Sequence, residues 1–121
     1  IENTNHTYDL HFDIEIDANS EPKKFSFTPK STSGDKQYDS YAWKYSLDNS
    51  PFEDLQNGQQ KTVALYSDSV NFEVDASGEK LKVKIGKNAF SNLSEFTICC
   101  IAHIKGTVAD YDEEIIDVKD F

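Results

Sequence analysis

Side chains that bind metal ions or act as nucleophiles are few in this sequence and widely spaced. The three histidines are His6, His11 and His103, and the two cysteines are the neighbours Cys99 and Cys100. A structural zinc site needs four ligands at characteristic short spacings, which this set does not provide. No serine, cysteine or lysine stands in a nucleophile motif, and no glycine-rich phosphate loop is present. We therefore expect no catalytic residue, no cofactor and no enzymatic activity.

Carboxylates are most concentrated in residues 110–114, Asp-Tyr-Asp-Glu-Glu. We expect this segment to be an acidic loop before the last strand, with Asp110, Asp112 and Glu113 as weak candidates for Ca²⁺, which prefers oxygen ligands. The segment lacks the glycine and the alternating ligand pattern of a dedicated calcium-binding loop. A solvated acidic loop without metal is therefore the favoured interpretation.

Aromatic residues outside the regular strand patterns form a second group of candidates. Exposed rings stack on sugars or anchor protein contacts. Tyr38, Phe52, Tyr66 and Tyr111 are on this basis candidates for contact with a ligand or partner. The favoured interpretation is nevertheless that such rings, Phe90 among them, fold back over the ends of the core.

The charge balance limits the kinds of partner. The chain has 22 acidic residues against 12 basic ones, all lysine, and a formal net charge of −10. An acidic surface repels phosphate backbones and anionic headgroups, and without arginine the usual bidentate reader of guanine is missing. We expect no nucleic-acid partner. No apolar run is long enough for a membrane span, so we expect no membrane insertion.

Alternation of apolar and polar residues predicts short strands along the chain. The clearest are residues 8–18 and residues 40–47, the second of which carries the single tryptophan, Trp43. In a strand, adjacent side chains point to opposite faces, so Cys99 and Cys100 are poorly placed to bridge each other. We expect both thiols to be free, with Cys100 buried and Cys99 partly exposed. Further strands are predicted near Phe25 and Phe27 and at 61–66, 70–74, 81–85, 96–104 and 115–118, with single helical turns at 52–55 and 88–90 and a polar lead-in at 1–7.

This succession of strands and turns predicts an all-β sandwich formed by one domain over residues 1–121. Trp43 is expected to fill the space between two sheets, against Ile98 and Cys100 of the facing sheet.

Stripes of opposite charge are expected on two strands. Asp9, Asp13, Glu15 and Asp17 share one face of the first strand with His11, and Lys80, Lys82 and Lys84 form a basic stripe on another strand. These stripes are expected either to lie side by side in one sheet or to meet a partner.

The run 41–49, Tyr-Ala-Trp-Lys-Tyr-Ser-Leu-Asp-Asn, resembles a strand and turn of bacterial and bacteriophage immunoglobulin-like modules. The run 81–85, the corner after it and the run 96–100 fit the same layout. The resemblance implies an immunoglobulin-like sandwich of about seven to eight antiparallel strands. Two departures stand out: Phe27 (or Phe25) and Ile98 occupy the places of the inter-sheet cysteines, and Phe96 replaces the usual corner tyrosine. An inter-sheet disulfide is therefore not expected.

The resemblance also implies a function class. It favours a non-catalytic structural or adhesive module of a larger surface protein or phage tail protein, located extracellularly, on a cell surface or on a virion. Its partner would be a protein or a cell-surface glycan, within a multidomain or multimeric assembly. The start at Ile1, without methionine, indicates an excised or processed piece. The alternative is a carbohydrate-binding module of an extracellular enzyme.

Overall fold

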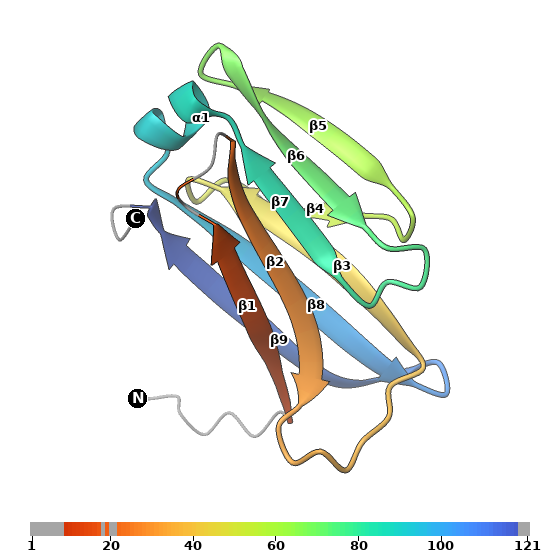
Figure 1. The fold of residues 1–121 in the computed structure, drawn as a ribbon. Coiled ribbons are helices and arrows are strands. Elements are labelled where there is room, and N and C mark those ends of the chain that lie inside the picture. Colours follow the sequence, from red (N-terminus) through yellow and green to blue (C-terminus); the bar gives the residue numbers. More distant parts are fainter. Residues whose placement is uncertain (1–8, 18, 20–21, 119–121) are drawn as a thin grey trace.

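Two antiparallel sheets pack face to face in the computed structural model, which describes residues 9–17, 19 and 22–118 (Figure 1). The five-stranded sheet has the order β1-β2-β7-β6-β5, and the four-stranded sheet has the order β4-β3-β8-β9. The predicted all-β sandwich is confirmed, with nine strands in the described residues. The strands are β1 (Leu10–Asp17), β2 (Lys23–Ser31), β3 (Ser40–Leu47), β4 (Glu53–Leu55), β5 (Gln60–Leu65), β6 (Asp68–Val74), β7 (Leu81–Ile85), β8 (Glu95–Ile104) and β9 (Thr107–Asp117), and the helix is α1 (Lys87–Asn92).

Trp43 is buried between the sheets, as the alternation in β3 predicts. Its ring stacks on Phe12 of the facing sheet at 5.8 Å between centroids, and its Nε1 donates a hydrogen bond of 2.7 Å to the carbonyl of Gly78. The prediction that Trp43 packs against Ile98 and Cys100 of the facing sheet is wrong about the sheet. Ile98 and Cys100 lie on β8, which is next to β3 in the same sheet, and Cys100 is directly opposite Trp43.

Aromatic rings occupy the centre of the core, and no disulfide links the described cysteines. Phe25 and Phe27 of β2 make edge-to-face contacts with Phe96 of β8, at 5.1 and 6.4 Å between centroids. Such contacts add to the apolar area that large rings bury. Cys99 and Cys100 are both free, as predicted, but the expectation of a partly exposed Cys99 is wrong, since it is only 5% exposed. Burial raises the pKa of Cys99 to about 11.

The corner between β7 and β8 contains the helix α1, where a single helical turn is predicted from the sequence. Asp68 receives the backbone N–H groups of Asn88 (2.8 Å) and Ala89 (3.3 Å), so its carboxylate supplies the acceptor that a helix start needs. Phe90 is buried against Phe25 at 6.5 Å between centroids. This ring therefore folds back over the end of the sandwich.

Two segments differ from their predicted structure. Residues 53–55 form β4 rather than a helical turn, because they pair with Trp43, Lys44 and Tyr45 at the edge of the sheet. The last strand begins at Thr107 rather than at residue 115, so residues 110–114 are strand and not an acidic loop. Acidic residues disfavour strands locally, but pairing along β8 decides the conformation here.

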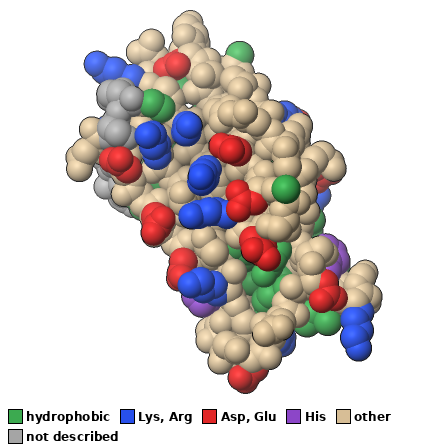
Figure 2. All heavy atoms as spheres, turned by 45° about the vertical axis from the view of Figure 1, so that its right-hand side comes forward, with side chains coloured by type: hydrophobic (Ala, Val, Ile, Leu, Met, Phe, Trp, Pro, Cys, Tyr) green, Lys and Arg blue, Asp and Glu red, His purple; other side chains and the backbone are tan. Residues whose placement is uncertain are grey.

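The predicted charge stripes lie in one sheet and on its outer face, although they are not adjacent. The acidic side chains of β1 and the lysines of β7 are separated by β2. Figure 2 shows lysine side chains on this side of the molecule with carboxylates on both sides of them.

Some sequence-based expectations lie outside the described residues: the lead-in 1–7 with His6, and the ends of the first predicted strand at Tyr8 and Ala18. Among the described residues, no helix has the length and apolar character that crossing a membrane requires.

Candidate functional site

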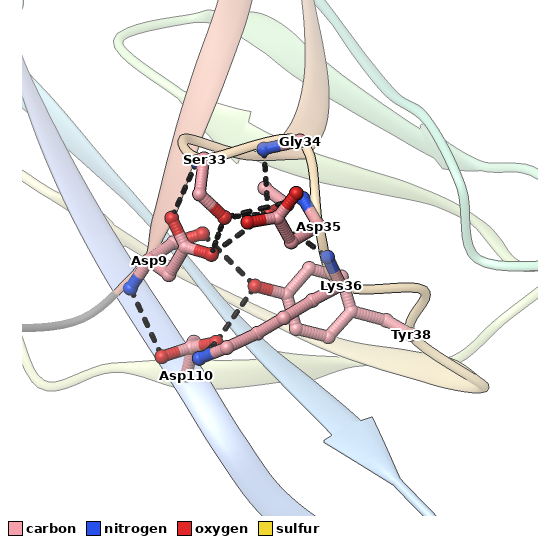
Figure 3. Close-up of polar contacts among 8 residues, drawn as sticks. Asp9, Ser33, Gly34, Asp35, Lys36, Tyr38 and Asp110 are labelled. Atoms are coloured by element: carbon pink, nitrogen blue, oxygen red, sulfur yellow. Dashed lines mark hydrogen bonds and ion pairs between the residues drawn. The ribbon is translucent and has the colours of Figure 1, made fainter.

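A network of polar side chains lies at one end of the sandwich, where the start of β1, the loop after β2 and strand β9 meet (Figure 3). The carboxylate of Asp9 accepts hydrogen bonds from the hydroxyl of Ser31 (2.8 Å) and from the hydroxyl (2.6 Å) and backbone N–H (2.7 Å) of Ser33. The hydrogen bonds from Ser33 and Ser31 lower the pKa of Asp9 to about 2. Asp9 is therefore ionised at neutral pH.

Asp110 is the buried member of this polar network, with only 2% of its surface exposed. Its carboxylate accepts hydrogen bonds from the Asp9 backbone N–H (3.0 Å), from Lys36 Nζ (2.9 Å) and from the Tyr38 hydroxyl (2.7 Å). Burial by itself raises the pKa of Asp110, but these three donors outweigh it and hold the pKa below its ordinary value. The Tyr38 hydroxyl also lies 2.9 Å from the carbonyl oxygen of Asp9.

The ionisation states of this network favour a structural role over acid–base chemistry. The hydrogen bond to Asp110 raises the pKa of Lys36, and burial raises that of Tyr38, so both keep their protons. General acid–base catalysis works best with a pKa near the working pH, and these shifts lead away from neutrality. The network therefore ties three distant segments together through fixed charges.

The calcium candidates do not converge. Asp112 and Glu113 are neighbours in β9 and so point to opposite faces of the sheet, while Asp110 is occupied by Lys36 and Tyr38. In the described ranges, no three or more acidic, histidine or cysteine side chains are grouped so that they could hold a metal ion.

The four candidate aromatic residues lie on different parts of the surface. Tyr38 is half-buried in the polar network, and Tyr111 is half-buried on the outer face of the four-stranded sheet, opposite Ile101. Phe52 (43% exposed) and Tyr66 (46% exposed) are more open. They therefore do not form one binding surface.

Tyr66 and Asp48 meet at the end of the sandwich that carries α1. The Tyr66 hydroxyl donates a 2.9 Å hydrogen bond to Asp48, whose other carboxylate oxygen accepts the backbone N–H groups of Ser94 and Glu95. The hydrogen bond to Asp48 raises the pKa of Tyr66. The Tyr66 hydroxyl is therefore held in place while much of the side chain remains exposed.

The outer face of the four-stranded sheet is the more apolar of the two outer faces. Strand register places Ala42, Ile101 and Tyr111 in one row across β3, β8 and β9. Val108 and Ile115 on β9 are each 58% exposed, although both are large apolar side chains. Val108 is not among the residues predicted from the sequence, because it lies before the predicted start of the last strand.

A hollow of about 500 Å³ opens beside β3 on this side of the sheet. It exists because β4 pairs only with Trp43–Tyr45, so the first residues of β3 have no strand beside them there. Its lining includes Ala42, Ile101, His103 and Val108. The Nδ1 atom of His103 is buried and has no hydrogen-bond partner, so a polar group next to the hollow is left unsatisfied.

No family model matches the chain, and no curated protein matches its sequence. Function is therefore inferred from the fold, from the polar network and from the two outer faces of the sandwich.

Proposed function

We propose that the chain is a non-catalytic immunoglobulin-like module of a larger extracellular, cell-surface or virion protein. In this proposal it positions neighbouring domains within a multidomain or multimeric assembly, and it contacts a protein partner through the outer face of its four-stranded sheet. The exposed apolar residues Val108 and Ile115 on that face are the observation that carries the proposal.

Strand order supports the immunoglobulin-like assignment. Immunoglobulin domains place their first, second, fifth and fourth strands in one sheet and their third, sixth and seventh in the other. The same succession appears here as β1-β2-β7-β6 and β3-β8-β9, with β5 and β4 added at the sheet edges. The turn after β3 also fits the motif, since Asp48 and Asn49 both have positive φ, which asparagine tolerates in place of glycine.

The polar network supports the absence of catalysis. Asp9, Asp110, Lys36 and Tyr38 are four ionisable groups in one network, and every one of them is hydrogen-bonded within the fold. Their pKa shifts keep each group in its ordinary charge state at neutral pH. Such a set stabilises the fold and is not prepared to transfer a proton.

The outer face of the four-stranded sheet supports a protein contact. Large apolar side chains exposed on a sheet lose their contact with water when a partner covers them, which is favourable. The hollow beside β3 adds a free strand edge, and exposed edges are templates for an added strand. The face therefore combines an apolar surface with available backbone groups.

Site-specific photo-crosslinking in the full-length protein tests this proposal. A photoreactive amino acid at Val108 or Ile115 should capture a neighbouring domain or a protein partner in the native assembly. The matched control is the same amino acid at Thr62, which is exposed on the five-stranded sheet. Capture from Thr62 equal to that from Val108 and Ile115, or no capture from either β9 position, would contradict the proposal.

A carbohydrate-binding module is the second candidate, because Phe52 and Tyr66 expose much of their surface at the α1 end. Exposed rings stack on sugar faces. A screen of neutral glycans, followed by fluorescence titration of the chain, tests this candidate. Saturable binding that is lost in Phe52→Ala or Tyr66→Ala would favour it, and binding unchanged in both variants would exclude these rings as the site.

A further inference from the structure

Three lysines on the outer face of the five-stranded sheet have no ion-pair partner in the part of the chain that the structure describes: Lys24, Lys82 and Lys84. All three side chains are exposed. Other lysines in this acidic chain do form ion pairs, namely Lys30 with Asp13, Lys36 with Asp110, Lys44 with Asp54 and Lys61 with Glu53.

Strand register holds these lysines close to one another. Lys24 of β2 lies directly opposite Lys84 of β7, and Lys82 follows on the same face of β7, about 7 Å along the strand. Like charges directly opposite each other destabilise a sheet. A hollow of about 330 Å³ lies among the three lysines, with Ser26 and the carboxylate-bearing Glu73 also in its lining. The sheet therefore concentrates positive charge on its exposed face, where the charges do not stabilise the fold.

Carboxylates border this lysine row on both sides. On one side, β1 carries Asp13, Glu15 and Asp17 on the same face, and on the other side Glu73 of β6 lies opposite Lys82. On the face that Figure 2 shows, lysine side chains have acidic side chains on both sides of them. The positive region is therefore narrow and runs along β7.

Because the lysine row is narrow, it favours some kinds of anionic partner over others. A broad anionic surface, such as a membrane or a nucleic-acid duplex, would bring its charges against the flanking carboxylates. A single flexible chain can follow the row and avoid them. Single-stranded nucleic acid is recognised largely by stacking on aromatic rings, but the outward positions of β2, β6 and β7 carry only lysine, serine, threonine, asparagine and glutamate.

We propose that this face binds a single chain of an anionic polysaccharide, whose sulfate or carboxylate groups lie along β7 against Lys24, Lys82 and Lys84. Ser26 is placed to hydrogen-bond a sugar hydroxyl in the hollow. This site is separate from the protein contact proposed above, which uses the opposite sheet, so either can fail without the other.

Calorimetric titration of the chain with heparin oligosaccharides and with oligogalacturonate tests the proposal, with neutral dextran as the reference. At 50 mM salt, saturable binding of at least one of the two anionic polymers is expected, and dextran should not bind. Binding to a single-stranded polyanion releases counterions in proportion to the number of charges neutralised, so the affinity falls as salt is added. For three lysines, the affinity at 200 mM salt should be about 20-fold lower than at 50 mM salt.

Charge variants locate the site. Lys84→Gln should weaken binding about fivefold and reduce the salt dependence by about one charge. Glu73→Gln should strengthen binding, because it removes a carboxylate opposite Lys82. The control is Lys44→Gln, which changes the net charge by the same amount on the other sheet and should leave the affinity unchanged. Lys84→Gln should keep or raise the melting temperature, since it relieves the repulsion by Lys24.

Several results would overturn the proposal. These are no saturable binding of either polymer at 50 mM salt, equal binding of dextran, or an equal loss of affinity in Lys84→Gln and Lys44→Gln. Tighter binding of single-stranded DNA or of anionic lipid vesicles, with the same dependence on Lys84, would assign the row to that other partner.

Discussion

The two ends of the sandwich are both held together by aspartates, but in different ways. At one end, Asp110 is buried, and its charge is balanced by Lys36 and by two further donors. At the other end, Asp48 and Asp68 accept mainly backbone N–H groups around α1. A buried carboxylate needs a counter-charge to offset its desolvation, whereas one nearer water needs only local dipoles. The first end should therefore tolerate substitution less well than the second.

The largest effect is expected from Asp110→Ala. Removing one partner of a buried ion pair costs about 3–5 kcal/mol, and the lower part of that range applies because Lys36 remains partly in water. We expect the free energy of unfolding to fall by roughly 3 kcal/mol in urea denaturation. Glu113→Ala removes an exposed carboxylate of the same strand and should change the stability little. Equal losses in the two variants would show that Asp110 is not the anchor of its end.

A tyrosine pair compares the two ends with the same chemical change. Tyr38→Phe removes a hydroxyl that bonds the Asp110 carboxylate and the Asp9 carbonyl oxygen, and it should cost about 1–2 kcal/mol. Tyr66→Phe removes a hydroxyl that bonds Asp48 at an exposed position, and it should leave the stability nearly unchanged. Denaturation curves of both variants give the comparison. A larger loss in Tyr66→Phe would reverse the ranking of the ends.

Substitution of Gly86 tests how much the Asp68 carboxylate contributes to stability at the α1 end. The Gly86 φ of −63° suits any residue, yet a Cβ there would clash with the carboxylate of Asp68. Gly86→Ala should displace that carboxylate from the helix start and cost about 1 kcal/mol, as loss of an N-cap does. In the double variant with Asp68→Ala, the added cost of Gly86→Ala should vanish. If the two costs simply add, the displacement of Asp68 is not the cause.

The two ends can also be compared at acid pH, through the pKa values of Asp9 at one end and Asp68 at the other. Because the folded pKa of Asp9 (about 2) lies below its ordinary value of 3.8, its contribution to stability is present above about pH 4 and is lost as the pH falls toward 2. Ser33→Ala should move the pKa of Asp9 upward in an NMR titration. Asp68, whose pKa is lowered mainly by the backbone N–H of Ala89, serves as the internal reference and should not move. An unchanged Asp9 would exclude Ser33 as the main cause of the shift.

Local patterning was enough to predict most of the strands. The predicted strands at 40–47 and 81–85 match β3 and β7, because alternation along one strand is a local property of the chain. The same pattern predicted the free thiols, since neighbours in a strand point apart. β4 was missed because three residues are too few to show an alternation, and only their pairing with β3 makes them a strand.

The residues relevant to function were harder to predict from the sequence, because their roles depend on tertiary structure. From sequence, Asp110 was one acid in an acidic run, and nothing in that run marked it as the member that Lys36 and Tyr38 would bury. Val108 lay before the predicted start of the last strand and proved to be an exposed apolar residue of that longer strand. These assignments depend on the register between strands, which local patterns do not contain.

By itself, the sequence determined the all-β class, most strand positions, the inward and outward faces of those strands, and the acidic balance. These follow from residue composition and from a period of two along the chain. Tertiary structure alone decided which strands became neighbours: it buried Asp110 against Lys36, left the start of β3 unpaired on the side of β4, and set Lys24 opposite Lys84. The physical reason is that pairing joins segments far apart in the chain, so the contacts depend on the packing of the whole sandwich.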